Sequence, residues 1–136
     1  MKQKETVLVS ACLVGLCTRY DAQVIENSAC MSRLNRFQWV PFCPEQLGGM
    51  PTPRTAADIV GGTGVDVLEK RAKVIDKNGT DVSLLFIKGA EQTLLLAKKL
   101  NIKRAILKAR SPSCGVNKQG VTAALLARNN FILEEF

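Results

Sequence analysis

Histidine is missing from this sequence, and so are cysteine pairs of the C-x-x-C type. The 136 residues include no histidine and five cysteines, none of which forms such a pair. Structural zinc sites usually take four Cys or His ligands, often from C-x-x-C pairs. These two absences make zinc the weaker metal candidate, unless Cys17 or Asp21 supplies a fourth ligand.

A long apolar segment is also missing. Residues 1–6 are mostly charged or polar, and Gly15, Arg19 and Asp21 interrupt the apolar stretch that starts at Val7. This pattern differs from a secretory signal peptide, and no stretch is long enough to span a membrane. We therefore expect a cytoplasmic protein with no membrane partner. Thiols stay reduced in that compartment, and the odd number of cysteines also argues against a disulfide framework.

Aromatic and acidic residues are few. Aromatics make up 5% of the chain, so aliphatic side chains must fill most of the core. The 19 Lys and Arg outnumber the 12 Asp and Glu, which gives a formal net charge of +7. Such a charge permits an anionic partner, such as a nucleotide or RNA. Because the basic residues are scattered along the chain, nucleic-acid binding is permitted but not indicated.

Predicted strands and predicted helices alternate along the chain. Short buried strands are predicted at residues 6–10, 39–43, 72–75, 104–108 and 131–133. Helices are predicted at 29–37, between Asp81 and Asn101, and at 120–128. This alternation predicts one α/β domain over residues 1–136, a three-layer sandwich around a mostly parallel sheet of the Rossmann or flavodoxin type.

Three cysteines follow predicted strands. Cys12 comes just after the first strand, Cys43 closes the second, and Cys114 lies a short loop beyond the strand at 104–108. Ligands of parallel α/β sheets bind outside the carboxyl ends of the strands, so we expect these cysteines to share one site. Cys30 falls on the apolar face of a predicted helix, which favours simple packing, and Cys17 has no comparable placement.

Thiolates are soft ligands that suit zinc, copper(I) and iron–sulfur centres. A four-iron cluster held by only three cysteines would keep one iron open, and an open metal can act as a Lewis acid. From spacing alone, a shared site and three separately packed core thiols are equal alternatives.

Five sequence motifs resemble those of a bacterial family, formerly catalogued as a domain of unknown function, that contains the 2-thiouracil desulfurase. They occur in the family's order along nearly the whole chain: SACLVG at 10–15, RYD at 19–21, PEQLGGMPTPR at 44–54, SPSCG at 111–115 and GVTA at 120–123. The resemblance implies a [4Fe–4S] cluster held by Cys12, Cys43 and Cys114, with catalytic roles for Glu45 and Ser111.

The implied reaction is desulfuration of a thiolated nucleobase, such as 2-thiouracil, or a related small thiocarbonyl compound. The substrate sulfur would bind the open iron, Glu45 would activate a water, and Ser111 would relay a proton or orient the ring. Arg19, Asp21 and Arg54 lie on the same loops and are candidates for hydrogen bonds to a pyrimidine edge or an attached phosphate.

The chain departs from the family pattern at three places, one of which is position 109, where Ala stands in place of a common acidic residue. Residues 115–119 form a much shorter segment than expected between Cys114 and Gly120, where relatives have a longer loop that could cover the substrate. Position 22 is Ala where a glycine is usual. A variant with the same cluster and another substrate is therefore an open alternative.

Two other functions are compatible with the sequence. One is a sensing or structural protein in which a cluster or a zinc ion holds the loops without turnover. The other, weaker alternative is a thiol redox protein that uses Cys12 and Cys17, which predicts a lowered thiol pKa and no metal requirement. The sequence leaves the oligomeric state open.

Overall fold

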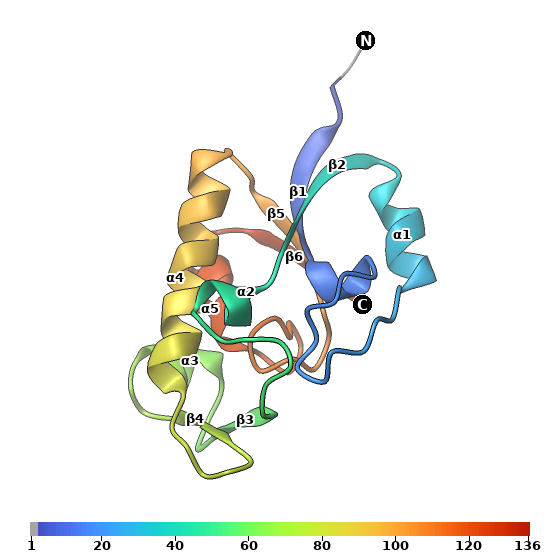
Figure 1. Cartoon of the computed structure of the whole chain (residues 1–136). Helices are drawn as coiled ribbons and strands as arrows, with labels where there is room; N and C mark the ends of the chain where they lie inside the picture. Colours follow the sequence, from blue (N-terminus) through green and yellow to red (C-terminus); the bar gives the residue numbers. More distant parts are fainter. Residues whose placement is uncertain (1–2) are drawn as a thin grey trace.

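Four parallel strands form the central sheet, in the order β2-β1-β5-β6 (Figure 1). They are β1 (Glu5–Ser10), β2 (Phe37–Phe42), β5 (Arg104–Leu107) and β6 (Ile132–Glu135). The structure is a computed structural model that describes residues 3–136. The strands predicted at 6–10, 39–43, 104–108 and 131–133 are confirmed, with ends that differ by one or two residues.

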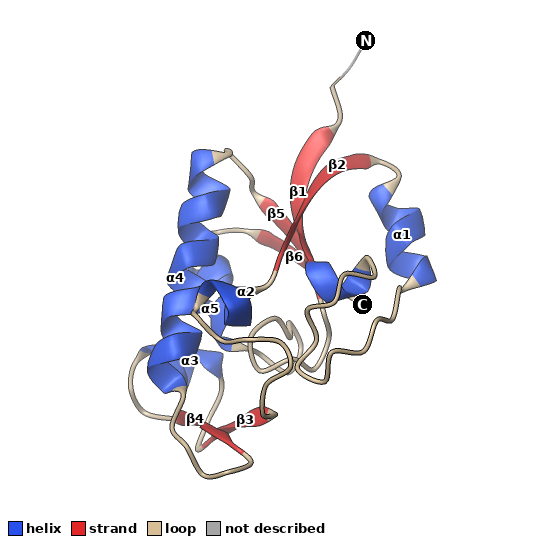
Figure 2. Cartoon of the chain, viewed as in Figure 1, coloured by secondary structure: helices blue, strands red, loops and turns tan. Residues whose placement is uncertain are grey.

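Strand β1 lies between β2 and β5, and helices cover both faces of the sheet. Val7 and Val9 point to one face, where they pack with Cys30 and Leu34 of helix α1 (Ser28–Leu34). Leu8 points to the opposite face, toward helices α4 (Ser83–Lys99) and α5 (Val121–Arg128). Figure 2 shows α1 on one side of the sheet and α4 and α5 on the other. The predicted three-layer α/β fold is confirmed.

Helix α4 confirms the helix predicted between Asp81 and Asn101. Phe86, Ala90 and Ala97 are buried, and Leu94 packs against the same core. Asp81 accepts hydrogen bonds from the backbone N–H and the hydroxyl of Ser83, which satisfies a free donor at the start of the helix. Cys30 is fully buried, and burial raises its pKa to about 11, in agreement with its predicted packing role.

A second, antiparallel sheet lies beyond the carboxyl ends of the parallel strands and was not predicted (Figure 1). It pairs β3 (Ala57–Val60) with β4 (Lys73–Asp76). The run at 72–75 is a strand, but it pairs here and not in the parallel sheet. The short helices α2 (Pro44–Leu47) and α3 (Gly64–Leu68) lie in segments for which no helix was predicted. Each of these elements spans about one turn or four residues, too short for a periodic apolar pattern.

Within residues 3–136, none of the helices combines the length and the apolar character needed to cross a bilayer.

An ion-pair network centred on Glu134 joins α1 to β5 and β6. Glu134 accepts hydrogen bonds from Arg33 at 2.8 and 2.9 Å and from Arg104 at 2.9 Å. Hydrogen bonding by Arg33, followed by that of Arg104, holds the pKa of Glu134 below its ordinary value of 4.5 despite partial burial.

We predict that Glu134→Gln lowers the free energy of unfolding by about 1–2 kcal/mol at pH 7. Because the folded-state pKa is depressed, the carboxylate's contribution is present above the unfolded-state pKa and is lost as the pH falls through the folded-state value. The difference from wild type should therefore shrink below about pH 4. Urea unfolding between pH 3 and pH 7 measures it, with the exposed Glu91→Gln as control. A difference that stays constant over this range would contradict the prediction.

Candidate active site

The site lies at the point in the sheet where the strand order reverses direction. From β1 the chain moves outward to β2, and it then returns to the other side of β1 to form β5 and β6. Parallel α/β sheets bind ligands in the crevice outside the carboxyl ends at this switch point. A pocket of about 390 Å³ lies there, lined by residues that follow β1, β2 and β5 and by residues of the β3–β4 sheet.

Seven of the eight residues singled out from the sequence line this one pocket: Cys12, Arg19, Cys43, Glu45, Arg54, Ser111 and Cys114. They come from four separate segments of the chain, so the convergence is a product of the fold. Asp21 is not part of the lining in the described chain and binds Arg19 instead.

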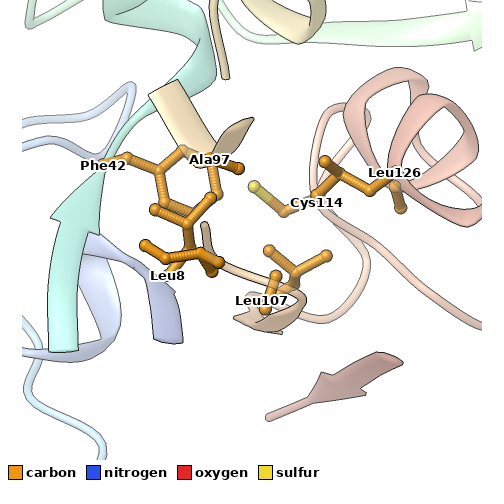
Figure 3. Packing of buried hydrophobic residues seen from close by; sticks show 9 residues of the cluster. Leu8, Phe42, Ala97, Leu107, Cys114 and Leu126 are labelled. Carbon is orange, nitrogen blue, oxygen red and sulfur yellow. The ribbon is translucent and has the colours of Figure 1, made fainter. Parts of the chain in front are cut away.

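The three cysteines are placed by three different elements. Cys12 lies in a single 3₁₀ turn, η1 (Ala11–Leu13), that follows β1. Cys43 follows β2 directly and is the N-cap residue of α2. Cys114 lies in the loop between β5 and α5, is 4% exposed, and packs among Leu8, Phe42, Ala97, Leu107 and Leu126 (Figure 3). Cys114 therefore belongs to both the pocket wall and the apolar core.

Burial dominates the electrostatics of two of these thiols. It raises the pKa of Cys114 far above the ordinary value, and a hydrogen bond with Ser10 only partly offsets this effect. Burial also raises the pKa of Cys12, against the opposing influence of Lys108 and Arg19. A cation that binds these sulfurs as thiolates must therefore displace protons from them.

The donor set fits an iron–sulfur cluster better than a single ion. Among residues 3–136, no three Cys, Asp or Glu side chains are grouped closely enough to hold one metal ion. Thiolates around one zinc would need sulfurs only about 4 Å apart, given Zn–S bonds of about 2.3 Å. The three cysteines line a pocket of about 390 Å³ together with the cations Arg19, Lys108 and Arg110, whose charge can offset that of the thiolates.

Glu45 lies in the first turn of α2, with its carboxylate held at both oxygens. Arg54 donates to Oε1 at 2.9 Å, and the hydroxyl of Ser113 donates to Oε2 at 2.9 Å. The Glu45 side chain is 16% exposed and that of Arg54 is 5% exposed. A carboxylate has about four lone-pair sites, so two remain for a ligand or a water.

Arg54 connects the loops that carry the site. Its guanidinium donates to Glu45, to the backbone carbonyls of Thr18 and Pro51, to the Thr52 hydroxyl, and at 3.8 Å to the sulfur of Cys43. These contacts engage all five of its N–H donors. Arg54 therefore positions Glu45 and Cys43, and it has no donor left over for a pyrimidine.

Arg19, another candidate substrate contact, still has N–H donors available for a ligand. Asp21 fixes it through hydrogen bonds from Nε and Nη2, both at 3.1 Å, and this pairing raises the pKa of Arg19 and lowers that of Asp21. The turn ends at Ala22, whose φ of +60° explains why glycine is usual there.

Ser111 has an unusual set of partners. Its oxygen accepts the backbone N–H groups of Ser113 and Cys114, both at 3.1 Å. Since both lone pairs are used, its hydroxyl hydrogen is the group that remains to donate into the pocket.

Several lining residues were not singled out from the sequence. Lys108 and Arg110 follow β5 directly, and their position after a strand could have marked them. Asp58 belongs to β3 and Lys77 directly follows β4, and no sequence pattern placed these two strands near the site. Ser113 was visible only as a member of the SPSCG motif.

A close approach of two backbones places α2, and with it Glu45, against α4. A Cβ atom on Gly89 of α4 would collide with the carbonyl oxygen of Pro44. A Cβ atom on Gly48, which ends α2, would collide with the carbonyl oxygen of Leu85. These two glycines therefore allow α2, which carries Glu45, to pack closely against α4.

Comparison with known proteins identifies the family. The family model described as 2-thiouracil desulfurase matches residues 7–135. The chain belongs to the 2-thiouracil desulfurase family. It is 40% identical to the uncharacterized protein YbbK of Bacillus subtilis (strain 168), over 92% of this chain and 91% of the relative.

A solved structure of a [4Fe–4S]-dependent thiouracil desulfidase, TudS, matches this desulfurase-family chain with a TM-score of 0.77 and 35% identity. The match covers 97% of this chain and 91% of that one. These findings confirm the family resemblance drawn from the motifs, and they agree with the predicted enzyme class and cofactor.

In this desulfurase-family chain we predict that Gly89→Ala destabilises the fold by about 1–3 kcal/mol and lowers activity, because the new methyl group pushes α2 away from α4. Helix propensity alone predicts the opposite sign, a gain of about 1 kcal/mol. Urea unfolding followed by circular dichroism measures the change. A variant as stable as wild type would mean that α2 moves freely on α4.

Proposed function

We propose that this chain is a [4Fe–4S]-dependent enzyme that removes sulfur by hydrolysis from a thiolated pyrimidine or a related small thiocarbonyl compound. The observation that carries the proposal is the pocket at the β1–β5 switch point. It brings three cysteine thiols, a doubly held carboxylate and a hydroxyl with one hydrogen to donate into a single cavity.

Cys12, Cys43 and Cys114 would hold the cluster, one from each segment that follows a parallel strand. When bound through three thiolates, such a cluster supplies an open iron, a soft Lewis acid that attracts a thiocarbonyl sulfur and polarises the carbon–sulfur bond. Lys108 and Arg19 favour the thiolate form of Cys12 through their charge. A structural relative, TudS, is itself named as [4Fe–4S]-dependent.

Glu45 is the proposed general base. It takes a proton from a water whose oxygen bonds to the thiocarbonyl carbon, and the carbon–sulfur bond then breaks. The substrate carbon exchanges sulfur for oxygen, and the sulfur leaves as hydrosulfide. No oxidant or reductant enters this balance. Arg54 and Ser113 keep the carboxylate in one orientation while it acts.

Ser111 is the proposed donor to the substrate ring. Its two backbone contacts leave the O–H directed away from the loop's own amides. A hydrogen bond from this group to a ring nitrogen or exocyclic oxygen would orient the pyrimidine. Arg19, fixed by Asp21, would supply a second donor from the opposite loop.

The partial burial of Cys12 counts against the thiol redox alternative. A reactive redox thiol needs a lowered pKa, and burial raises that of Cys12. A sensing or structural role remains distinguishable by experiment, since it predicts a cluster without turnover.

We predict that protein purified and reconstituted without oxygen shows a brown iron–sulfur absorption band, and that Cys12→Ala, Cys43→Ala and Cys114→Ala each lose it. Iron and sulfide assays on the same samples check the content. Cys17→Ser, which changes an exposed thiol outside the pocket, is the matched control and should keep the band. A colourless wild-type protein that takes up no iron would overturn the proposed cofactor.

We predict that Glu45→Gln lowers kcat for 2-thiouracil by roughly 10²–10⁴-fold with the cluster intact, since the amide cannot accept the proton. Release of uracil, followed by chromatography, measures the rate. Wild-type turnover in this variant would exclude Glu45 as the base, and a wild-type enzyme that holds the cluster but turns over no thiolated base would favour the sensing role.

A further inference from the structure

Ser113 is the buried partner of the proposed base. Its side chain is almost fully enclosed, with the residue 2% exposed, and its hydroxyl donates to Oε2 of Glu45 at 2.9 Å. The other carboxylate oxygen receives Nε–H of Arg54, also at 2.9 Å. The two donors come from different loops and hold opposite oxygens, so together they fix the plane of the carboxylate.

The backbone of Ser113 is itself held firmly. Its carbonyl accepts the N–H groups of Thr122 and Ala123 in the first turn of α5, at 2.9 and 3.1 Å. Its own N–H donates to Ser111 at 3.1 Å. A Cβ atom on Gly120 would collide with the Ser113 backbone, so α5 and this loop are in direct contact. Ser113 therefore presents its hydroxyl from a rigid support.

We propose that Ser113 is a positioning residue that orients Glu45 for attack by water, an inference that rests on the proposed function. Without its hydroxyl, only Arg54 restrains the carboxylate, which can then pivot about that single contact. Misplacement of a reacting group by about 1 Å can cost a rate factor of about 10².

This assignment gives the SPSCG loop three neighbouring tasks. Ser111 donates to the substrate, Ser113 holds the base and Cys114 binds the cluster. The residue between the two serines is Pro112, whose carbonyl accepts the N–H of Val121 at 2.8 Å. The loop thus aligns the base and the cofactor through one anchored segment.

The first experiment compares Ser113→Ala and Ser113→Thr with wild type in the cluster-loaded enzyme, with equal iron and sulfide content verified. We expect Ser113→Ala to lower kcat about 10- to 100-fold with little change in KM, and Ser113→Thr to recover part of the loss. In a Glu45→Gln background, Ser113→Ala should cause no further loss, because the group that it positions is already inactive. An equal loss in both backgrounds would overturn the inference.

Ser83→Ala is the matched control. Ser83 also donates its hydroxyl to a carboxylate, that of Asp81 at 2.6 Å, but it lies at the start of α4 and outside the pocket lining. Its loss removes the same kind of contact without changing kcat.

A second measurement needs no cluster. Urea unfolding of the cluster-free wild type, Ser113→Ala, Glu45→Gln and the double variant tests whether the two side chains are coupled. We expect non-additive losses, and strict additivity would contradict the contact. If wild type turns over no thiolated base, the proposed function fails. The unfolding comparison of the four proteins still decides whether Ser113 and Glu45 are coupled. If wild type is active and Ser113→Ala has full kcat, only the positioning role fails.

Discussion

The ion pair between Arg54 and Glu45 is the interaction on which the site depends. Both side chains are largely removed from water, and loss of one partner from such a pair costs roughly 3–5 kcal/mol, because the other charge is left uncompensated. Arg54 also reaches the Thr18 carbonyl and the Cys43 sulfur. The same guanidinium therefore fixes the proposed base, a proposed cluster ligand and the loop after β1, and these three parts can only move together.

The central strands β1 and β5 could be predicted from the sequence because they are buried on both faces and read as continuous apolar runs. The β3–β4 sheet could not, since each strand has four residues and only partial burial. Helix α2 could not be predicted from the sequence for a related reason. Its four residues begin with a proline and precede two glycines, so the segment resembles a loop in composition, although Pro44 in fact occupies a favoured first helical position.

Spacing and topology placed the three cysteines at one edge of the sheet, and the motifs added Glu45 and Ser111. The roles of Arg54 and Ser113 depend on contacts between loops that lie far apart in sequence, which no local pattern encodes. Ser113 is 68 residues from Glu45. A further contact of this kind holds the loop 115–119, because Glu135 of β6 accepts the N–H groups of Val116 and Asn117.

That contact from β6 bears on when the pocket can exist during synthesis. The walls of the site come from residues that span Cys12 to Cys114, and the last wall is fastened by Glu135. A growing chain that has released β1 and β2 from the ribosome carries two of the cysteines but no enclosed cavity. The complete pocket wall, with the loop after Cys114 held by Glu135, therefore forms only once β6 has paired with β5.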